Sequence, residues 1–329
     1  MSLAIGVDIG GTKIAAGLVS EDGKIVESAR HETPATEAAE IAPMVAELVE
    51  RLRGNHEILG IGIGAAGFID AARQTVLFAP NIDWVNEPLA AEVRDRVGLP
   101  VIVENDANAA AWGEFRFGAG EDTNDLLLVT VGTGIGGGIV HDGQLFRGGF
   151  GVAAEIGHMR VVRGGILCGC GQLGCWEQYA SGSALVREAR ELVTADDPRA
   201  AALAASVGGD GTLINGPMVT KLAQRGDALA VDLLTDVGHW LGEGIATLCT
   251  ILDPRVVAIG GGVAAAGDLL LAPIQESFDQ FLSAHDHRPI AALRLAALGN
   301  QAGLIGAADL ARSAPAGTMP DSTLASGNS

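Results

Sequence analysis

The chain has 329 residues, of which 47 are glycine, and 48% of its residues are hydrophobic. Glycine is about twice as frequent as in an average protein and follows no three-residue period, which excludes a collagen and a largely disordered chain. The 40 acidic and 21 basic residues give a net charge of −19, which argues against nucleic-acid binding and against an anionic membrane surface. No apolar run is long enough to cross a bilayer, and no signal sequence precedes the first strand, so we expect a cytoplasmic protein.

Apolar runs separated by turn residues predict an α/β organisation for the first 120 residues. Strands are expected where short apolar runs end in Gly, Asp or Asn, and helices where apolar residues recur every three or four positions. The expected strands are 3–8, 14–20, 24–30, 57–64 and 101–104, and the expected helices are 36–53, 86–96 and 107–117.

The same pattern then begins again near residue 126. Residues 11–19 match residues 132–140 at an offset of 121, through Gly-Thr, Ile and Gly positions, and an Asp-Gly turn follows in both copies. Two such halves predict two similar α/β domains facing each other across a cleft. The remaining elements expected are strands at 126–132, 135–140 and 256–259 and helices at 183–194, 215–225, 227–252, 268–284 and 301–312. We expect a small domain of residues 1–112 with a returning helix at 299–312, a large domain of 113–298, and a disordered tail of 313–329.

Glycine-rich turns after three of the strands are candidate phosphate and nucleoside sites, because glycine lets backbone N–H groups turn toward an anion. The first turn joins two strands and ends in a lysine, and Asp8 beside it could orient Mg²⁺. The second would bind the same polyphosphate, and the third would lie against a flat adenosine. Their residues are Asp8, Gly10, Gly11, Thr12 and Lys13; Gly132, Thr133 and Gly134; and Gly261 and Gly262. The first could instead be a plain tight hairpin with an aspartate at its edge. Residues 132–137 also satisfy Gly-x-Gly-x-x-Gly, but a strand rather than a helix follows, which disfavours a dinucleotide site.

Asp106 is a candidate general base for an attacking hydroxyl. It follows the strand 101–104 and opens the helix 107–117, a position from which it could face a cleft. Asp106 or Asn105 could equally be the N-cap of that helix, and the spacing alone leaves both roles open. Five other polar residues at loop positions could bind sugar hydroxyls: Asn81, Asn105, Glu155, His158 and Glu177.

One imidazole and three thiols predict a structural zinc site. Their spacing is His158-x9-Cys168-x-Cys170-x4-Cys175. Four soft ligands with no open position suit tetrahedral Zn²⁺, although buried free thiols are the alternative. Glu155 and Glu177 flank the four ligands, so closing the site would bring these two carboxylates together.

These segments resemble the ROK family of sugar kinases (repressor, open reading frame, kinase), most closely its bacterial glucokinases. The matching motifs occur in the family's order over about residues 3–310. They are Asp8-Ile-Gly-Gly-Thr-Lys13, Pro80-Asn81-Ile-x-Trp84, Glu104-Asn105-Asp106, Gly132-Thr133-Gly134, Glu155-Ile-Gly-His158 and Cys168-Gly-Cys-Gly-Gln-Leu-Gly-Cys175-Trp-Glu177.

The resemblance implies a duplicated actin-like ATPase fold, related to ribonuclease H, with two α/β domains around a cleft. It implies transfer of the γ-phosphoryl group of Mg-ATP to the 6-hydroxyl of a hexose, with glucose as the expected substrate, and a homodimer or tetramer. Asp106 maps onto the catalytic base and His158 with the three cysteines onto the zinc ligands. The hexose contacts map onto Asn81, Asn105, Glu155, His158 and Glu177, together with the backbone of Gly67, where the family often has Pro-Gly and this chain has Ala66-Gly67.

Three alternatives remain at this point. The hexose could be N-acetylmannosamine, mannose, fructose or N-acetylglucosamine, since kinases for these sugars share the motifs. Inorganic polyphosphate could replace ATP as the donor. A sugar-responsive repressor of the same family is disfavoured, because we expect the first strand to begin at Leu3 without a helix-turn-helix before it.

Overall fold

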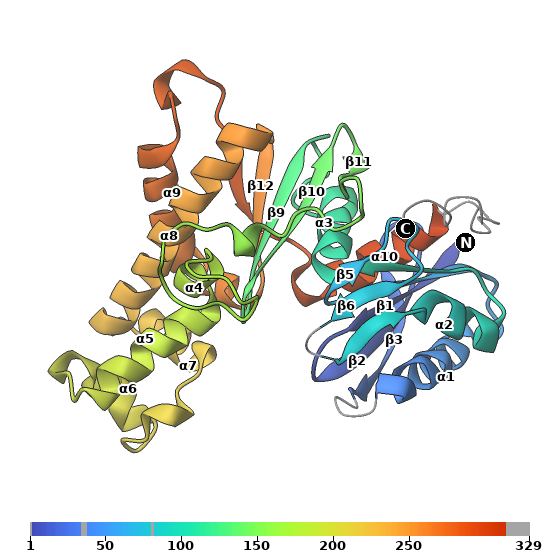
Figure 1. Cartoon of the computed structure of the whole chain (residues 1–329), viewed down its shortest axis with the longest axis horizontal. Coiled ribbons are helices and arrows are strands. Elements are labelled where there is room, and N and C mark those ends of the chain that lie inside the picture. Colours follow the sequence, from blue (N-terminus) through green and yellow to red (C-terminus); the bar gives the residue numbers. More distant parts are fainter. Residues whose placement is uncertain (1, 34–37, 80–81, 314–329) are drawn as a thin grey trace, which may run out of the picture. The chain divides into compact units, whose positions relative to one another are not determined.

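The computed structural model of the chain describes residues 2–33, 38–79 and 82–313 (Figure 1). These residues form two compact units. The first comprises the described residues up to Phe117, the segment Phe146–Ala153, and the described residues from Gln301 onward; the second comprises Gly118–Leu145 and Ala154–Asn300. Compared with the boundaries expected from the sequence, residues 113–117 and 146–153 lie with the first unit. The expected disordered tail falls outside the described residues, apart from Ser313.

The first unit is built on a five-stranded sheet in the order β3-β2-β1-β4-β8. Its strands are β1 (Leu3–Ile9), β2 (Lys13–Val19), β3 (Ile25–Glu32), β4 (Ile58–Ala65) and β8 (Val101–Asn105). Strands β1, β2 and β3 pair antiparallel, whereas β1, β4 and β8 run parallel. The carboxyl ends of the three parallel strands therefore meet at one edge of the sheet, which is where ligands bind in open α/β sheets.

Strand β4 shows one use of glycine in this chain, because isoleucine and glycine alternate along residues 61–64. Ile61 and Ile63 belong to a core with α1 (Ile41–Arg53) and α2 (Leu89–Val97) on one face of the sheet. On the other face a Cβ on Gly62 would overlap the carbonyl oxygen of Ala307 in α10 (Ala302–Arg312). The small face thus lets α10 lie directly on the sheet, beside α3 (Asp106–Phe117), as Figure 1 shows.

The second unit repeats this topology with a sheet in the order β11-β10-β9-β12-β13. Its strands are β9 (Leu126–Val131), β10 (Ile135–His141), β11 (Gln144–Leu145), β12 (Val256–Gly260) and β13 (Ala292–Leu295). Strands β9, β12 and β13 run parallel, and β10 pairs antiparallel with both β9 and β11. The strand order of the first sheet therefore recurs, as the internal sequence match predicts.

Helices cover the second sheet and supply most of its core. They are α4 (Glu177–Ala180), α5 (Gly182–Thr194), α6 (Ala201–Ser206), α7 (Gly216–Gln224), α8 (Ala228–Leu252) and α9 (Asp268–Phe281). Gly242 of α8 has no room for a Cβ against Ile274 and Ser277 of α9, so these two helices pack closely. None of the helices in the described part of the chain is long and apolar enough to span a membrane.

The structure corrects the sequence-based elements mainly between residues 66 and 97. A three-stranded antiparallel sheet that was not expected lies there, formed by β5 (Phe68–Ile69), β6 (Val76–Ala79) and β7 (Trp84–Glu87). The expected helix 86–96 begins only at Leu89, because residues 84–87 pair with β6 and Pro88 interrupts the ladder. Within the expected helix 36–53, a short 3₁₀ segment (Ala38–Glu40) precedes α1, and residues 34–37 lie outside the described chain. Strand β13 was also missed, and the expected helix 268–284 ends at Phe281.

Candidate active site

Two aspartates lie at the edge of the first sheet where its parallel strands end. Asp8 is near the end of β1, and Asp106 follows β8 as the first residue of α3. Both face Gly303 of α10, where a Cβ would lie 3.7 Å from the main-chain oxygen of Asp106 and 3.9 Å from Oδ1 of Asp8. The sheet topology therefore brings together two aspartates that are almost 100 residues apart in the sequence, and the charge of Asp106 raises the pKa of Asp8.

Asn105, not Asp106, caps helix α3. The Oδ1 of Asn105 accepts a hydrogen bond of 3.0 Å from the backbone N–H of Asn108, which is the N-cap geometry. Its Nδ2 donates to the carbonyl oxygen of Gly67 at 3.2 Å. Gly67 has φ +137°, and a Cβ there would overlap the carbonyl oxygen of Phe78, so glycine is needed where the chain passes the end of β6. The Asp106 carboxylate is thus not needed to cap the helix.

The environment of the two aspartates favours their protonated forms. Burial raises the pKa of Asp106 above its ordinary value, although backbone hydrogen bonds oppose this. The pKa of Asp8 is raised to about 6, first by burial and then by the charge of Asp106, while Lys13 lowers it. Carboxyl groups with raised pKa values at a sheet edge are typical of acid–base and metal-binding sites.

The first glycine turn lies beside Asp8 at the end of β1. The N–H of Gly10 donates to the carbonyl oxygen of Lys13 at 3.0 Å, which closes the turn. Thr33, which follows β3, stabilises this turn, because Oγ1 of Thr33 donates to the carbonyl oxygen of Gly10 at 2.7 Å. Gly11, Thr12 and Lys13 are exposed at the tip, so an anion can approach the turn there.

The second glycine turn forms one end of a cavity in the second unit. The carbonyl oxygens of Gly132 and Thr133 accept hydrogen bonds from the N–H groups of Gly182 and Ser183, at 2.8 and 3.3 Å. Gly261, with φ +86°, lies so close to Val131 that a Cβ would be 2.5 Å from its oxygen. The second and third glycine segments predicted from the sequence therefore lie side by side.

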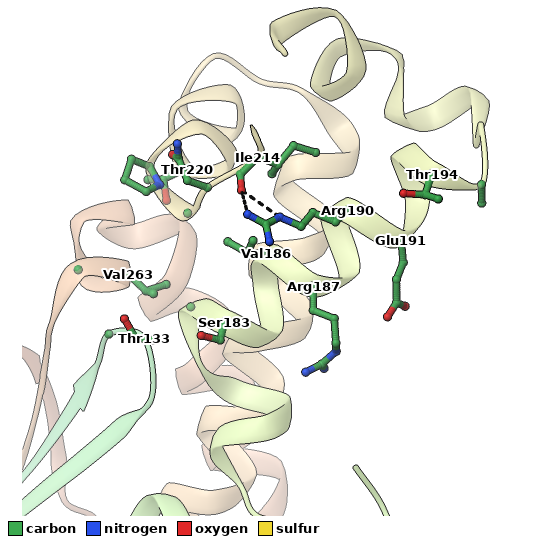
Figure 2. A pocket seen from close by; sticks show the side chains of 17 residues that line it. Thr133, Ser183, Val186, Arg187, Arg190, Glu191, Thr194, Ile214, Thr220 and Val263 are labelled. Atoms are coloured by element: carbon green, nitrogen blue, oxygen red, sulfur yellow. Dashed lines mark hydrogen bonds between the residues drawn. The ribbon is translucent and has the colours of Figure 1, made fainter. Parts of the chain in front are cut away.

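The cavity has a volume of about 980 Å³ and extends from these turns between α5 and α7 (Figure 2). Gly132, Thr133, Gly262 and Val263 line one end, and Ile214, Asn215 and Pro217 are among the residues at the other. The guanidinium of Arg190 donates to the carbonyl oxygen of Ile214 from Nε at 3.2 Å and from Nη2 at 2.8 Å, as the dashed lines in Figure 2 show. A volume of this size, with a polar glycine-rich end, suits a nucleotide.

Glu155, His158 and Glu177 come together in the second unit. The two ring nitrogens of His158 face different carboxylates: Nδ1 lies 3.8 Å from Oε1 of Glu177, and Nε2 lies 4.0 Å from Oε2 of Glu155. Glu155 is the central residue of an inverse γ-turn, with φ −72° and ψ 53° and a 2.7 Å bond from the N–H of Ile156 to the oxygen of Ala154. Glu177 lies against Gly134, where a Cβ would contact its carboxylate. Acceptors and an imidazole are thus grouped beside the second glycine turn.

The four predicted zinc ligands also converge. One atom each of His158, Cys168, Cys170 and Cys175 lies within 4.8 Å of the others. The Sγ atoms of Cys170 and Cys175 are 3.6 Å apart, and Sγ of Cys168 is 3.7 Å from Nδ1 of His158. Zinc–sulfur bonds of about 2.3 Å give tetrahedral edges of about 3.8 Å, so the spacing and the donor types fit Zn²⁺.

The loop that carries these ligands depends on Gly174, which has φ +78° and no room for a Cβ beneath the carbonyl oxygen of Val162. Next along the chain, Trp176 is fully buried on Gly244 of α8 and donates from Nε1 to the oxygen of Trp240 at 2.8 Å. The zinc loop and Glu177 are therefore fastened to the long helix of the second unit.

Comparison with known proteins identifies the family. The ROK family model matches residues 4–314. The chain belongs to the ROK family. The glucokinase of Streptomyces coelicolor is 52% identical over 314 residues, which are 95% of this chain and 98% of that protein. The glucokinase of Halalkalibacterium halodurans is 40% identical over 311 residues, 92% of each chain. A crystal structure of a ROK family glucokinase from Streptomyces griseus in complex with glucose and AMPPNP is 51% identical, with a TM-score of 0.87, and covers 95% of this chain and 100% of that one.

Membership of the ROK family agrees with the observed duplication, and the chain has the actin-like ATPase fold of its ROK structural relatives. Of the site residues expected from the sequence, Asn81 lies outside the described residues. The structure groups the others by unit. Asp8, the first glycine turn, Gly67, Asn105 and Asp106 lie in the first unit, and the second and third turns, Glu155, Glu177 and the zinc ligands lie in the second.

Sequence reasoning missed the residues that α5 and α7 contribute to the cavity of this ROK-family chain. From α5 these include Ser183, Arg187, Arg190 and Thr194, and Thr220 comes from α7. The spacing of the α5 residues, i, i+4, i+7 and i+11, places them on one helix face and was readable from the sequence. The sequence carried no signal that this face borders a cavity rather than solvent.

Proposed function

We propose that the chain is an ATP-dependent glucokinase, which transfers the γ-phosphoryl group of ATP to the 6-hydroxyl of glucose. The observation that carries the proposal is the 52% identity to a glucokinase over nearly the full length of both chains. The site chemistry supports it, because the carboxylate at the start of α3 is freed from capping by its neighbour.

In the proposed mechanism Asp106 accepts the proton of the attacking hydroxyl. Phosphoryl transfer depends mainly on positioning and charge stabilisation, so a carboxylate held at a sheet edge is sufficient as base. Asp8 would orient Mg²⁺ or its water ligands, and the turn Gly10–Lys13 would contact the phosphates. When bound with ATP, Mg²⁺ neutralises charge on the phosphate oxygens.

The second unit would bind the nucleotide in the cavity beside Gly132–Gly134, with Gly261 and Gly262 against the adenosine. Glu155, His158 and Glu177 would bind hexose hydroxyls, together with Asn81, Asn105 and the backbone of Gly67 from the first unit. His158, Cys168, Cys170 and Cys175 would hold a structural zinc ion, which would keep the hexose-binding loop in shape rather than take part in the reaction.

Two further proposals concern the state of the protein in the cell. We propose that it acts in the cytoplasm and as a homodimer or homotetramer. Sedimentation of the purified chain, with and without glucose, measures the oligomeric state, and a monomer at micromolar concentration would contradict it.

A coupled assay tests the function directly. Glucose, mannose, fructose, N-acetylmannosamine and N-acetylglucosamine are each offered with Mg-ATP and with Mg-polyphosphate. The proposal expects the highest kcat/KM for glucose with ATP. A higher value for another hexose would replace glucose as the substrate, and turnover with polyphosphate alone would replace ATP as the donor.

The assignment of the base is tested by Asp106→Asn. We expect kcat to fall by about 10² to 10⁴-fold with the fold retained, because a positioned base contributes on that scale. Asp95→Asn is the matched control, since Asp95 is on the surface of α2 with its side chain 77% exposed. Turnover in Asp106→Asn equal to that of the control would remove Asp106 from the role of base.

A further inference from the structure

A buried ion cluster lies immediately before the proposed base in the chain. Glu104 is only 1% exposed, and its Oε2 lies 2.8 Å from Nε of Arg147 and 2.9 Å from Nε of Arg73. Its Oε1 accepts hydrogen bonds from the N–H of Asn105 at 3.0 Å and from Nδ2 of Asn108 at 3.1 Å. One carboxylate therefore holds two arginines and the first turn of α3.

Arg147 belongs to the loop Phe146–Ala153, which packs as part of the first unit. Its side chain is 11% exposed, and its guanidinium also donates to the carbonyl oxygens of Ala71 and Asp70, both at 2.9 Å. The N–H of Ala153 donates to the oxygen of Arg147 at 3.2 Å, which closes the loop. The residues before and after Phe146–Ala153 belong to the second unit. Arg147 therefore holds this short segment on the first unit.

Glu155, a proposed hexose contact, follows closely after this loop in the chain. Gly151, with φ +89°, lies so close to the β5 end that a Cβ would be 2.7 Å from the oxygen of Ile69. Ala154 then has φ +71°, a conformation that is unfavourable for a residue with a Cβ. Glu155 follows at once in its inverse γ-turn. The backbone between the loop and Glu155 is thus tightly constrained and short.

From this arrangement we infer that Arg147 is a positioning residue for hexose binding. By pairing with Glu104 it fixes the loop 147–153 to the same carboxylate that holds the start of α3. It thereby restrains the stretch of chain that ends at Ala153, two residues before Glu155. The inference rests on the proposed function, because Glu155 is a proposed hexose contact. Loss of Arg147 should weaken glucose binding while leaving the nucleotide cavity, which lies wholly in the second unit, unchanged.

The chain offers a matched control in a second cluster of the same kind. Asp309 is 4% exposed and pairs with Arg312 at 2.7 Å and with Arg116 at 3.1 Å. Arg312 also donates to two carbonyl oxygens, those of Val19 and Ser20, at 3.0 and 3.1 Å. This cluster lies where β2 ends, which is opposite to the carboxyl ends of the parallel strands because β2 runs antiparallel to β1. Removing an arginine from this cluster should therefore lower the stability of the protein without changing KM for glucose.

The experiment compares four variants: Arg147→Met, Arg147→Lys, Arg73→Met and Arg312→Met. Each is assayed for kcat, KM for glucose and KM for ATP, after circular dichroism and thermal unfolding have established that it folds. Arg147→Met should raise KM for glucose at least about tenfold, because small displacements of a positioned group have effects of this size. KM for ATP should stay within about twofold. Arg147→Lys keeps the charge but cannot contact Glu104 and both carbonyl oxygens together. Its KM for glucose should therefore lie between those of the wild type and Arg147→Met.

The controls separate positioning from stability. Arg73→Met removes the other arginine that pairs with Glu104 but leaves the hydrogen bonds of Arg147 to the carbonyl oxygens of Asp70 and Ala71 in place. Arg312→Met removes an equally buried arginine elsewhere. Both should change KM for glucose by less than about twofold even if they unfold at lower temperature. The inference is overturned if Arg147→Met leaves KM for glucose unchanged or if Arg312→Met raises it equally. Should Arg147→Met not fold, the same criterion applies to Arg147→Lys. A wild-type chain that does not phosphorylate glucose would instead remove the proposed function, and this inference with it.

Discussion

The aspartate at the end of β1 should destabilise the free protein at neutral pH. The pKa of Asp8 is raised from 3.8 to about 6, so the folded state binds a proton more tightly than the unfolded state does. A difference of about two pKa units corresponds to about 3 kcal/mol above pH 6. The carboxylate is therefore held in an unfavourable environment, as expected for a group kept for ligand binding rather than for stability. Replacing it by the neutral Asp8→Asn should raise the free energy of unfolding.

The pH dependence of this gain follows from the same shift. Below about pH 3 the carboxyl is protonated in both states, and the substitution changes little. As pH rises through the window from 3.8 to about 6, only the unfolded state loses its proton, so wild-type stability falls relative to the variant. The gain should be about 1.5 kcal/mol at pH 5 and at most about 3 kcal/mol at pH 8, and it should then stay constant.

Urea unfolding at pH 5 and pH 8, without Mg²⁺ or ATP, measures the effect. Because the charge of Asp106 contributes to the raised pKa of Asp8, the gain from Asp8→Asn should be smaller in an Asp106→Asn background, a non-additivity expected of neighbouring charges. Asp95→Asn again serves as the surface control. The reasoning is refuted if Asp8→Asn is no more stable than wild type at pH 8, or if its advantage does not grow between pH 5 and pH 8.

Three further predictions concern the second unit. Cys170→Ser should lower bound zinc well below one ion per chain by metal analysis and reduce the unfolding temperature; an unchanged zinc content would contradict the four-ligand site. Gly174→Ala should do the same without removing a ligand, because its Cβ would overlap the oxygen of Val162; retained zinc and stability would show that the loop can relax. Arg190→Met removes the hydrogen bonds from α5 to the carbonyl oxygen of Ile214 at the far end of the cavity. Because a charge-assisted hydrogen bond contributes about 1.5 kcal/mol or more, KM for ATP should rise about tenfold while KM for glucose stays unchanged. Steady-state kinetics with each substrate varied measures both constants, and a rise in KM for glucose alone would contradict the prediction.

The elements that could be predicted from the sequence are those with a strong local pattern. Strand β1, the long helix α8 and the repeated strand–turn–strand unit were found within one or two residues of their observed ends. The small sheet β5–β7 was missed because its strands are two to four residues long and their pairing depends on neighbours in space. Strand β13 was missed for the same reason, since only its parallel partner β12 makes it a strand.

The site was predictable where its chemistry follows a spacing in the chain. The convergence of the four proposed zinc ligands is of this kind, because ligands on one loop must have compatible spacing to close around one ion. The choice between Asp106 and Asn105 as helix cap was not, because both residue types cap helices equally well. It was decided by the reach of Asn105 to Gly67, which lies 38 residues earlier in the chain.

By itself, the sequence determined the identity of the chemical groups, the family motifs and the duplicated strand order, since these are encoded in local patterns and fixed spacings. Only the tertiary structure decided that Arg147 returns to Glu104, that α5 and α7 enclose a nucleotide-sized cavity, and that Asp8 and Asp106 share one sheet edge. Those contacts join residues tens to hundreds of positions apart. They depend on which faces of helices and sheets pack together, and packing is a property of the folded chain rather than of any segment.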